Sequence, residues 1–270
     1  MRARPLFSAR GVCLYAFTAG TIILGGDSLA AADELELTTE TVTTEPASRA
    51  AHFLPGALQA EMDSSATAVG TGWAGYDGAT KNPVANATAE AWVVPRLSFT
   101  AGFGSTTQPG EVRLRAQGGV RVMLLDQRRA GINAAVGFLY RQDRFAGEEG
   151  MLEWSAMLSR RFGATLAMAN FIYAQDGEGD DHEGEVRAVG LHDFGARLHV
   201  GLDTRVRSSL GSSDPHRAEH SNPTLEFNAG PLVAYSIGQF SLMSEVGISG
   251  QKVDRLSTGV LVMGGLAAAF

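Results

Sequence analysis

The stretch from Glu111 to Gln142 constrains the fold more than any other, because apolar residues recur there at every second position. One set of alternate residues is Val112, Leu114, Ala116, Gly118, Val120, Val122 and Leu124. The opposite set carries arginines, and after a polar turn at 126–129 the alternation resumes from Ile132 to Tyr140. A period of two predicts β-strands with one apolar face. Both strands exceed the roughly five or six residues usual in soluble sheets and suit strands tilted across a bilayer.

The same period recurs along the chain from residue 55. It predicts strands at 57–63, 88–94, 97–104, 112–124, 132–141, 152–158, 162–174, 185–191, 196–207, 225–235 and 240–248, and a last strand ending at Phe270. Tight turns are expected near residues 95, 127, 161, 194 and 237, and longer polar connections at 64–83, 105–110, 143–149, 175–184, 209–222 and 251–256. Short turns at one end and longer loops at the other are typical of outer-membrane barrels. We therefore predict an all-β fold, a single antiparallel transmembrane β-barrel with an up-and-down meander of twelve strands, within a range of 10–14.

The N-terminus predicts export. Arg2, Arg4 and Arg10 precede an apolar stretch at 11–26, and small residues follow at 28–32, so residues 1–32 are expected to be a secretory signal peptide; an uncleaved anchor helix is the alternative. Residues 33–54 are acidic and rich in Thr, which predicts a periplasmic linker, with a segment folded back to plug the barrel as the alternative. Residues 55–270 form the predicted barrel.

Charge and cysteine content exclude other classes. Removing the signal takes three arginines and Asp27 from the 22 basic and 29 acidic residues, so the net charge becomes −9 and nucleic acid is not an expected partner. The one cysteine, Cys13, lies inside the signal, and a closed barrel does not need disulfides. No stretch after residue 30 holds 18 consecutive apolar residues, so no helical membrane span is expected there.

The signal, the alternating strands and a last strand ending in Phe270 together resemble a bacterial outer-membrane β-barrel of Gram-negative type. The resemblance covers about residues 55–270 and is one of class. It implies a location in the outer membrane, contact with outer-membrane lipid, and recognition of the C-terminal strand by the barrel-assembly machinery through Phe270 and the alternate residues before it.

The face opposite the apolar residues would line the lumen. Its predicted lumen-lining charged residues and His are Arg113, Arg115, Arg121, Arg141, Glu153, Arg197, His199, Asp203, Arg205, Arg207, Glu226 and Glu245. Both signs on one inner wall predict a salt-bridged ladder that braces the barrel. The functional reading is that the arginines line a pore that favours anionic or polar solutes.

Two loops hold other candidate chemistry. The segment 176–185 is dense in carboxylates and could hold a divalent cation, but its spacing is not that of an EF-hand, and a solvated surface loop is favoured. His220 and Ser221 locally resemble the His and Ser of outer-membrane phospholipases and lipid A deacylases, although adjacency does not supply catalytic geometry. No cofactor or metal site is predicted, because phosphate-loop, dinucleotide and CxxC motifs are absent.

These observations predict a non-enzymatic outer-membrane pore or transporter that passes small polar or charged solutes by diffusion through a charged lumen. A structural or adhesive barrel with a blocked lumen is the first alternative, and an outer-membrane lipid hydrolase is the second. A soluble secreted sandwich also fits a period of two, because a second sheet can cover an apolar face as lipid does.

Overall fold

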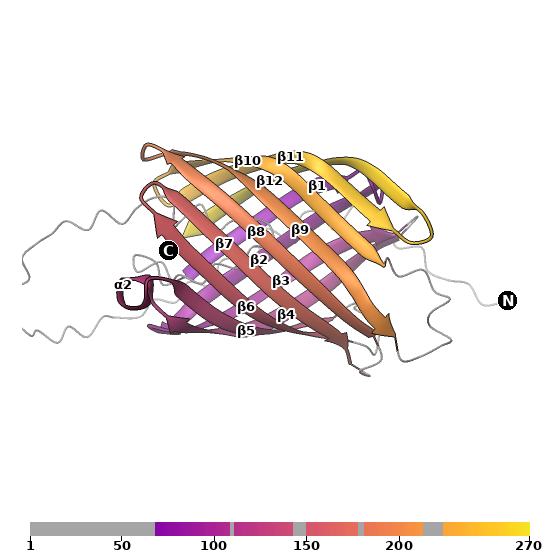
Figure 1. Ribbon diagram of the computed structural model, residues 1–270, viewed down its shortest axis with the longest axis horizontal. Coiled ribbons are helices and arrows are strands. Elements are labelled where there is room, and N and C mark those ends of the chain that lie inside the picture. Colours follow the sequence, from indigo (N-terminus) through magenta and orange to yellow (C-terminus); the bar gives the residue numbers. More distant parts are fainter. Residues whose placement is uncertain (1–67, 109–110, 143–149, 178–180, 213–223) are drawn as a thin grey trace, which may run out of the picture. The chain divides into compact units, whose positions relative to one another are not determined.

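The computed structural model describes residues 68–108, 111–142, 150–177, 181–212 and 224–270, which form a closed barrel of twelve antiparallel strands (Figure 1). The strands are β1 (Ala68–Asp77), β2 (Asn82–Val94), β3 (Leu97–Gln108), β4 (Glu111–Leu125), β5 (Asn133–Gln142), β6 (Gly150–Phe162), β7 (Thr165–Asp176), β8 (Asp181–Phe194), β9 (Leu198–Ser212), β10 (Leu225–Ile237), β11 (Phe240–Lys252) and β12 (Leu256–Ala269). Each pairs with its neighbours in sequence, and β12 pairs with β1 to close the sheet. The predicted meander of twelve strands is confirmed.

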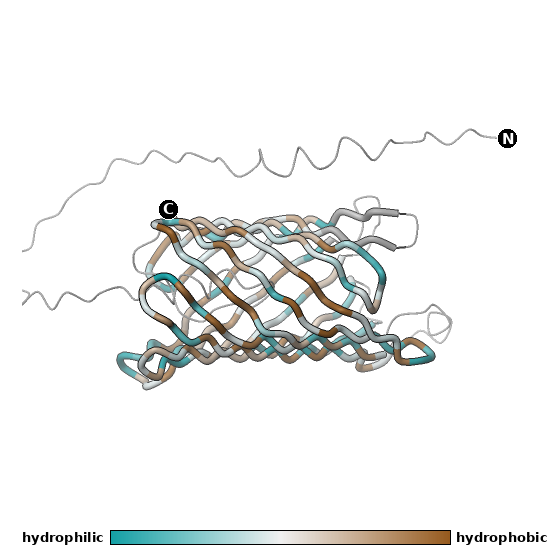
Figure 2. Tube along the Cα trace, turned by 90° about the horizontal axis from the view of Figure 1, so that it is seen from above, coloured by the Kyte–Doolittle hydropathy of each residue, from teal (hydrophilic) through white to brown (hydrophobic). Residues whose placement is uncertain are grey.

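The outer face of the barrel is apolar. Large hydrophobic side chains on it are about half exposed, among them Phe99 at 52%, Leu202 at 53% and Val246 at 50%. Figure 2 shows hydrophobic residues along the strands and hydrophilic ones at several connections. A surface of this kind is unstable in water but suits lipid, and a closed sheet leaves no backbone edge unpaired in the hydrocarbon. The strands therefore form a transmembrane barrel, with alternate residues facing lipid and interior. In the described ranges, no helix is both long enough and apolar enough to cross a bilayer.

The hairpin predicted between Glu111 and Gln142 is present. β4 and β5 pair with Val120 opposite Phe138 and Val122 opposite Val136, so the apolar residues of the two strands share the outer face. Their connection contains α2 (Gln127–Ala130). Asp126 caps this helix by accepting a hydrogen bond from the Arg128 backbone N–H, and Gly131 ends it in the left-handed region at φ 76°.

The prediction was wrong about the first strand. The segment 64–83, expected to be a loop, contains β1, whereas the strand expected at 57–63 lies outside the described residues. Three glycines and two alanines in AVGTGWAGYD obscure the alternation. Pairing with both β2 and β12 supplies the backbone hydrogen bonds that make this segment a strand.

Several connections are also shorter than predicted. β7 continues to Asp176 and β8 starts at Asp181, so most of the segment 175–184, which was expected to be a loop, is strand. β9 extends alongside it, with Glu183 opposite Ser209, and holds it in the sheet. At the other end, the turn expected near residue 161 lies at 163–164, where Gly163 has φ 57°.

Candidate functional site

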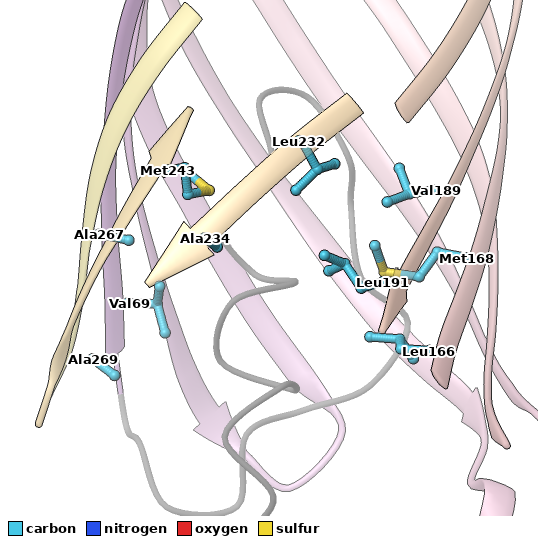
Figure 3. Close-up of a cluster of buried hydrophobic side chains, with 10 residues drawn as sticks. All are labelled: Val69, Leu166, Met168, Val189, Leu191, Leu232, Ala234, Met243, Ala267 and Ala269. Atoms are coloured by element: carbon cyan, nitrogen blue, oxygen red, sulfur yellow. The ribbon is translucent and has the colours of Figure 1, made fainter. Parts of the chain in front are cut away.

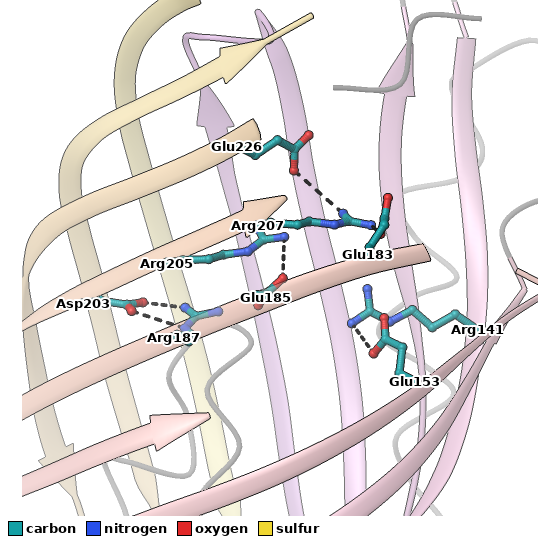
Figure 4. A network of polar contacts seen from close by, with 9 residues as sticks. All are labelled: Arg141, Glu153, Glu183, Glu185, Arg187, Asp203, Arg205, Arg207 and Glu226. Atoms are coloured by element: carbon teal, nitrogen blue, oxygen red, sulfur yellow. Dashed lines mark hydrogen bonds and ion pairs between the residues drawn. The ribbon is translucent and has the colours of Figure 1, made fainter. Parts of the chain in front are cut away.

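The inner wall of the barrel carries a ladder of ion pairs between β8 and β9, which we call the charged ladder (Figure 4). Its members are Glu183, Glu185 and Arg187 on β8 and Asp203, Arg205 and Arg207 on β9. The register places Arg187 directly opposite Arg205, so straight pairing would bring like charges together. Each arginine instead pairs with the acid two residues away, as in Arg205–Glu185 at 2.9 Å.

Two of these pairs differ in burial. The Arg187 and Asp203 side chains are 5% and 0% exposed and are joined through Nε and Nη2 of the guanidinium. Arg207 pairs with Glu183 and also lies 3.8 Å from Glu226 on β10. Burial makes the Arg187–Asp203 contact the energetically decisive one, because a buried charge depends on its partner.

Ion pairs continue along the wall beyond the ladder. Arg141 on β5 contacts Glu153 on β6 at 3.0 Å. Arg121 on β4 contacts Glu90 on β2 at 2.5 Å, and the Ser98 hydroxyl of the strand between them donates to the same carboxylate. The arginines of these pairs are therefore balanced by acids, so they do not give the wall a surplus of positive charge.

Most of the predicted lumen residues lie on this inner wall. Arg121, Glu153, His199, Asp203 and Glu245 are buried, with exposed fractions of 7% or less. Arg115, Arg141, Arg205, Arg207 and Glu226 are partly buried. The side chain of Arg113 lies outside the described residues.

Arg197 was assigned wrongly to the inner wall. It is exposed and lies in the turn at 195–197, because β9 begins one residue later, at Leu198. Its carbonyl oxygen accepts a hydrogen bond from the Ser236 backbone N–H at 2.8 Å, so the residue closes the short-turn end.

A second polar chain lies at this short-turn end; the sequence had pointed to its His199 but not to the other members. Arg161 contacts Asp193 at 3.1 Å, and Asp193 Oδ1 lies 2.8 Å from His199 Nδ1. His199 Nε2 lies 3.2 Å from Ser236 Oγ, which is 2.9 Å from the Ser241 hydroxyl. The strand alternation could have found them, because Asp193 faces His199 and Ser236 faces Ser241 in register.

Asp193, His199 and Ser236 are hydrogen-bonded in the order of a hydrolase triad. Their surroundings instead favour a structural role in which they link neighbouring strands. His199 is fully buried, and the Ser236 N–H donates to the Arg197 carbonyl, so it is not available to stabilise an oxyanion. The chain instead links β6, β8, β9, β10 and β11 by side-chain hydrogen bonds.

Apolar side chains line part of the same half of the barrel; we call them the apolar wall (Figure 3). They are Val69, Leu166, Met168, Val189, Leu191, Leu232, Ala234, Met243, Ala267 and Ala269. They come from β1, β7, β8, β10, β11 and β12, near the ends joined by short turns. A solute crossing the barrel would meet the charged ladder on the loop side and the apolar wall on the turn side.

The loop end has a small pocket with a volume of about 40 Å³. Arg205, Glu226, Asn228, Asp77 and Gln251 contribute polar lining. Asp77 is held by the Ser249 hydroxyl at 2.5 Å and by the Ala79 N–H at 2.9 Å. The charged ladder therefore continues into a polar depression at the loop end.

The other sequence candidates contribute little here. Among the residues that the structure describes, no group of three His, Cys, Asp or Glu side chains is arranged to hold a metal ion. His220 and Ser221 lie outside the described residues, as does part of the acidic segment.

Comparison with solved structures identifies the fold. The NanC porin matches 74% of this chain and 100% of its own, with a TM-score of 0.55 and 12% identity. The KdgM porin in complex with disordered oligogalacturonate matches 75% and 99%, with a TM-score of 0.53 and 8% identity. An outer membrane channel from Pseudomonas putida F1 matches 80% and 99%, with a TM-score of 0.52 and 9% identity. No family model and no curated protein matches the sequence. The chain therefore has the fold of bacterial outer-membrane β-barrels.

Proposed function

We propose that this chain is an outer-membrane pore that passes small polar or charged solutes by diffusion. The observation that carries the proposal is an apolar exterior combined with an inner wall of ion pairs that extends into the polar pocket at the loop end. An apolar exterior suits lipid, and a polar interior gives a solute hydrogen-bonding partners in place of water.

The likeness in fold supports the same function. Two of the similar structures are described as porins and a third as an outer membrane channel, and one porin is described with an oligogalacturonate. Since the arginines here are balanced by acids, we infer that the lumen suits neutral polar or zwitterionic solutes as well as ions.

The remaining parts of the chain have proposed roles in export and assembly. Residues 1–32 are the proposed signal peptide and residues 33–54 the proposed periplasmic linker. The proposed assembly signal is the last strand with Phe270, whose backbone N–H donates to the Ala68 carbonyl at 2.8 Å where the barrel closes.

Liposome swelling tests the proposed transport. Vesicles containing the protein are expected to swell in isotonic solutions of small sugars and amino acids, at rates that fall with solute size, whereas protein-free vesicles do not. Vesicles with inserted protein that swell no faster than empty ones would contradict the proposal.

A barrel with a blocked lumen is the second candidate, and the apolar wall favours it, because apolar side chains inside a barrel favour contact with other apolar groups over water. Catalysis is not part of either proposal. A fluorophosphonate probe is expected to leave Ser236 unlabelled, since its backbone N–H is already bonded; labelling lost in Ser236→Ala would overturn that expectation.

A further inference from the structure

Glu245 is a buried carboxylate on the inner wall without a counter-charge. It lies on β11, paired in register with Leu232 on one side and Met263 on the other, and it is 3% exposed. Among the residues that the structure describes, neither Oε1 nor Oε2 has a hydrogen-bond partner.

Other acids of the inner wall are held differently. Glu90, Glu153, Glu183, Glu185, Asp193, Asp203 and Glu226 each contact an arginine. The charges that act on Glu245 are those of Asp203 and Arg187, and these two already pair with each other. An ionised carboxylate taken out of water without a partner is strongly destabilised. The wall described here pairs no cation with Glu245, so the carboxylate is neutralised there either by a proton or by a cation that enters from the lumen.

The wall next to Glu245 carries no side chain at two positions, one on β10 and one on β11. Gly230 and Gly247 also face inward, and a Cβ added to Gly230 would lie 2.7 Å from the Gly247 Cα. The two backbones approach so closely that neither position tolerates a side chain. The inner wall beside the Glu245 carboxylate is therefore bare backbone, and Arg187, whose charge acts on this carboxylate, is already paired with Asp203.

We propose that Glu245 binds a monovalent cation or an ammonium group of a permeating solute inside the lumen, and thereby gives the pore a preference for cations. The preference rests on the proposed pore function. It differs from the expectation drawn from the sequence, in which the arginines would favour anions.

The test is the reversal potential of the protein in planar bilayers under a KCl gradient. Replacement of Glu245 by Gln is expected to lower the permeability ratio of potassium to chloride about fivefold. This is the factor that corresponds to losing the attraction between two unit charges roughly 4 Å apart in water. Asp254→Asn removes the same charge from an exposed turn residue and is expected to leave the ratio unchanged. An unchanged ratio in Glu245→Gln would overturn the proposal.

Chemical restoration of the charge gives a second variant. In a Cys13→Ser background, which removes the chain's one cysteine, Glu245→Cys is neutral and accepts methanethiosulfonate reagents. An ethylsulfonate reagent is expected to restore the cation preference, and an ethylammonium reagent to reverse it. If both reagents shift the reversal potential alike, charge at this position is not the cause. Replacing potassium by methylammonium and then by N-methyl-D-glucamine separates binding of a metal ion from binding of an ammonium group.

Infrared spectroscopy decides the state of Glu245 even if the barrel does not conduct. The difference spectrum between wild type and Glu245→Gln is expected to contain an ionised carboxylate band that moves when potassium is replaced by N-methyl-D-glucamine. A protonated acid band at neutral pH would instead show that a proton neutralises Glu245, and the cation site would be rejected. Silent bilayers together with a cation-sensitive carboxylate band would reject the pore but not the site.

Discussion

Breaking the Arg187–Asp203 pair should destabilise the barrel more than removing both charges. In Asp203→Asn, the Arg187 guanidinium, 5% exposed, loses its counter-charge and still faces Arg205 across the strand pair. Loss of one partner of a buried pair costs about 3–5 kcal/mol. Arg187→Gln leaves the buried Asp203 carboxylate alone, with a cost of similar size. In the double variant neither charge remains, so the loss is expected to be smaller than in either single variant.

A double-mutant cycle measures this difference. The free energy of unfolding from lipid vesicles is obtained from urea titrations followed by tryptophan fluorescence, with gel mobility of unheated samples as a check on folding. The coupling energy is expected to reach about 3 kcal/mol, since each single variant carries a penalty that the double lacks. Additive losses, with a coupling energy below roughly 0.5 kcal/mol, would show that the two charges are not mutually dependent and would refute the inferred ladder.

Three further predictions test the faces of the strands, their packing and a turn. Leu202→Arg puts a charge on the lipid-facing side of β9, where Leu202 is 53% exposed, and should reduce the free energy of unfolding by about 2–4 kcal/mol near the midplane. Arg205→Ala on the inner face of the same strand should still assemble. Equal folded yields of the two variants after refolding into vesicles would argue against a strand with one lipid-facing and one interior face. Gly247→Ala would bring a Cβ to 2.6 Å from the Gly230 Cα and should reduce the folded yield, while Gly118→Ala, whose nearest neighbour is 3.8 Å away, should not; similar yields would mean that the close approach is unimportant. Hydrogen bonds and charge from Arg128 lower the pKa of Asp126, so the cap should stabilise its turn above about pH 3.9, the ordinary aspartate pKa, and lose that effect as the pH falls through the lowered folded-state pKa. The protection factor of the Arg128 amide, which is its hydrogen-exchange rate relative to the intrinsic rate at the same pH, should therefore fall on acidification in wild type and be low at every pH in Asp126→Ala.

Most of the barrel could be predicted from the sequence. Each strand forms its backbone hydrogen bonds with the neighbouring strands, and its two faces contact different surroundings, lipid on one side and the barrel interior on the other. Because the two faces differ, apolar and polar residues alternate along β4, β5 and β9. The prediction failed for β1, which pairs with β12 where the barrel closes, because its small residues differ little between the two faces. Strand ends were misplaced where pairing with a longer neighbour, as between β8 and β9, extends a strand into polar residues.

The candidate site was predictable by face but not by partner. Alternation assigns a residue such as Asp203 to the interior. It does not say that Arg187 will reach diagonally past Arg205, because that choice depends on the register of two strands. The unpaired state of Glu245 is also invisible in the sequence, since it follows from which strands flank β11 and from the glycines beside it. Arg197 was misassigned because the predicted strand was extended beyond the start of β9 into the preceding turn.

Single-channel recording of the inserted protein tests the pore most directly. Discrete current steps are expected, with a reversal potential under a salt gradient of the sign that denotes cation preference. Protein shown to be inserted and heat-modifiable that gives no current steps would contradict a diffusive pore and would favour the blocked barrel.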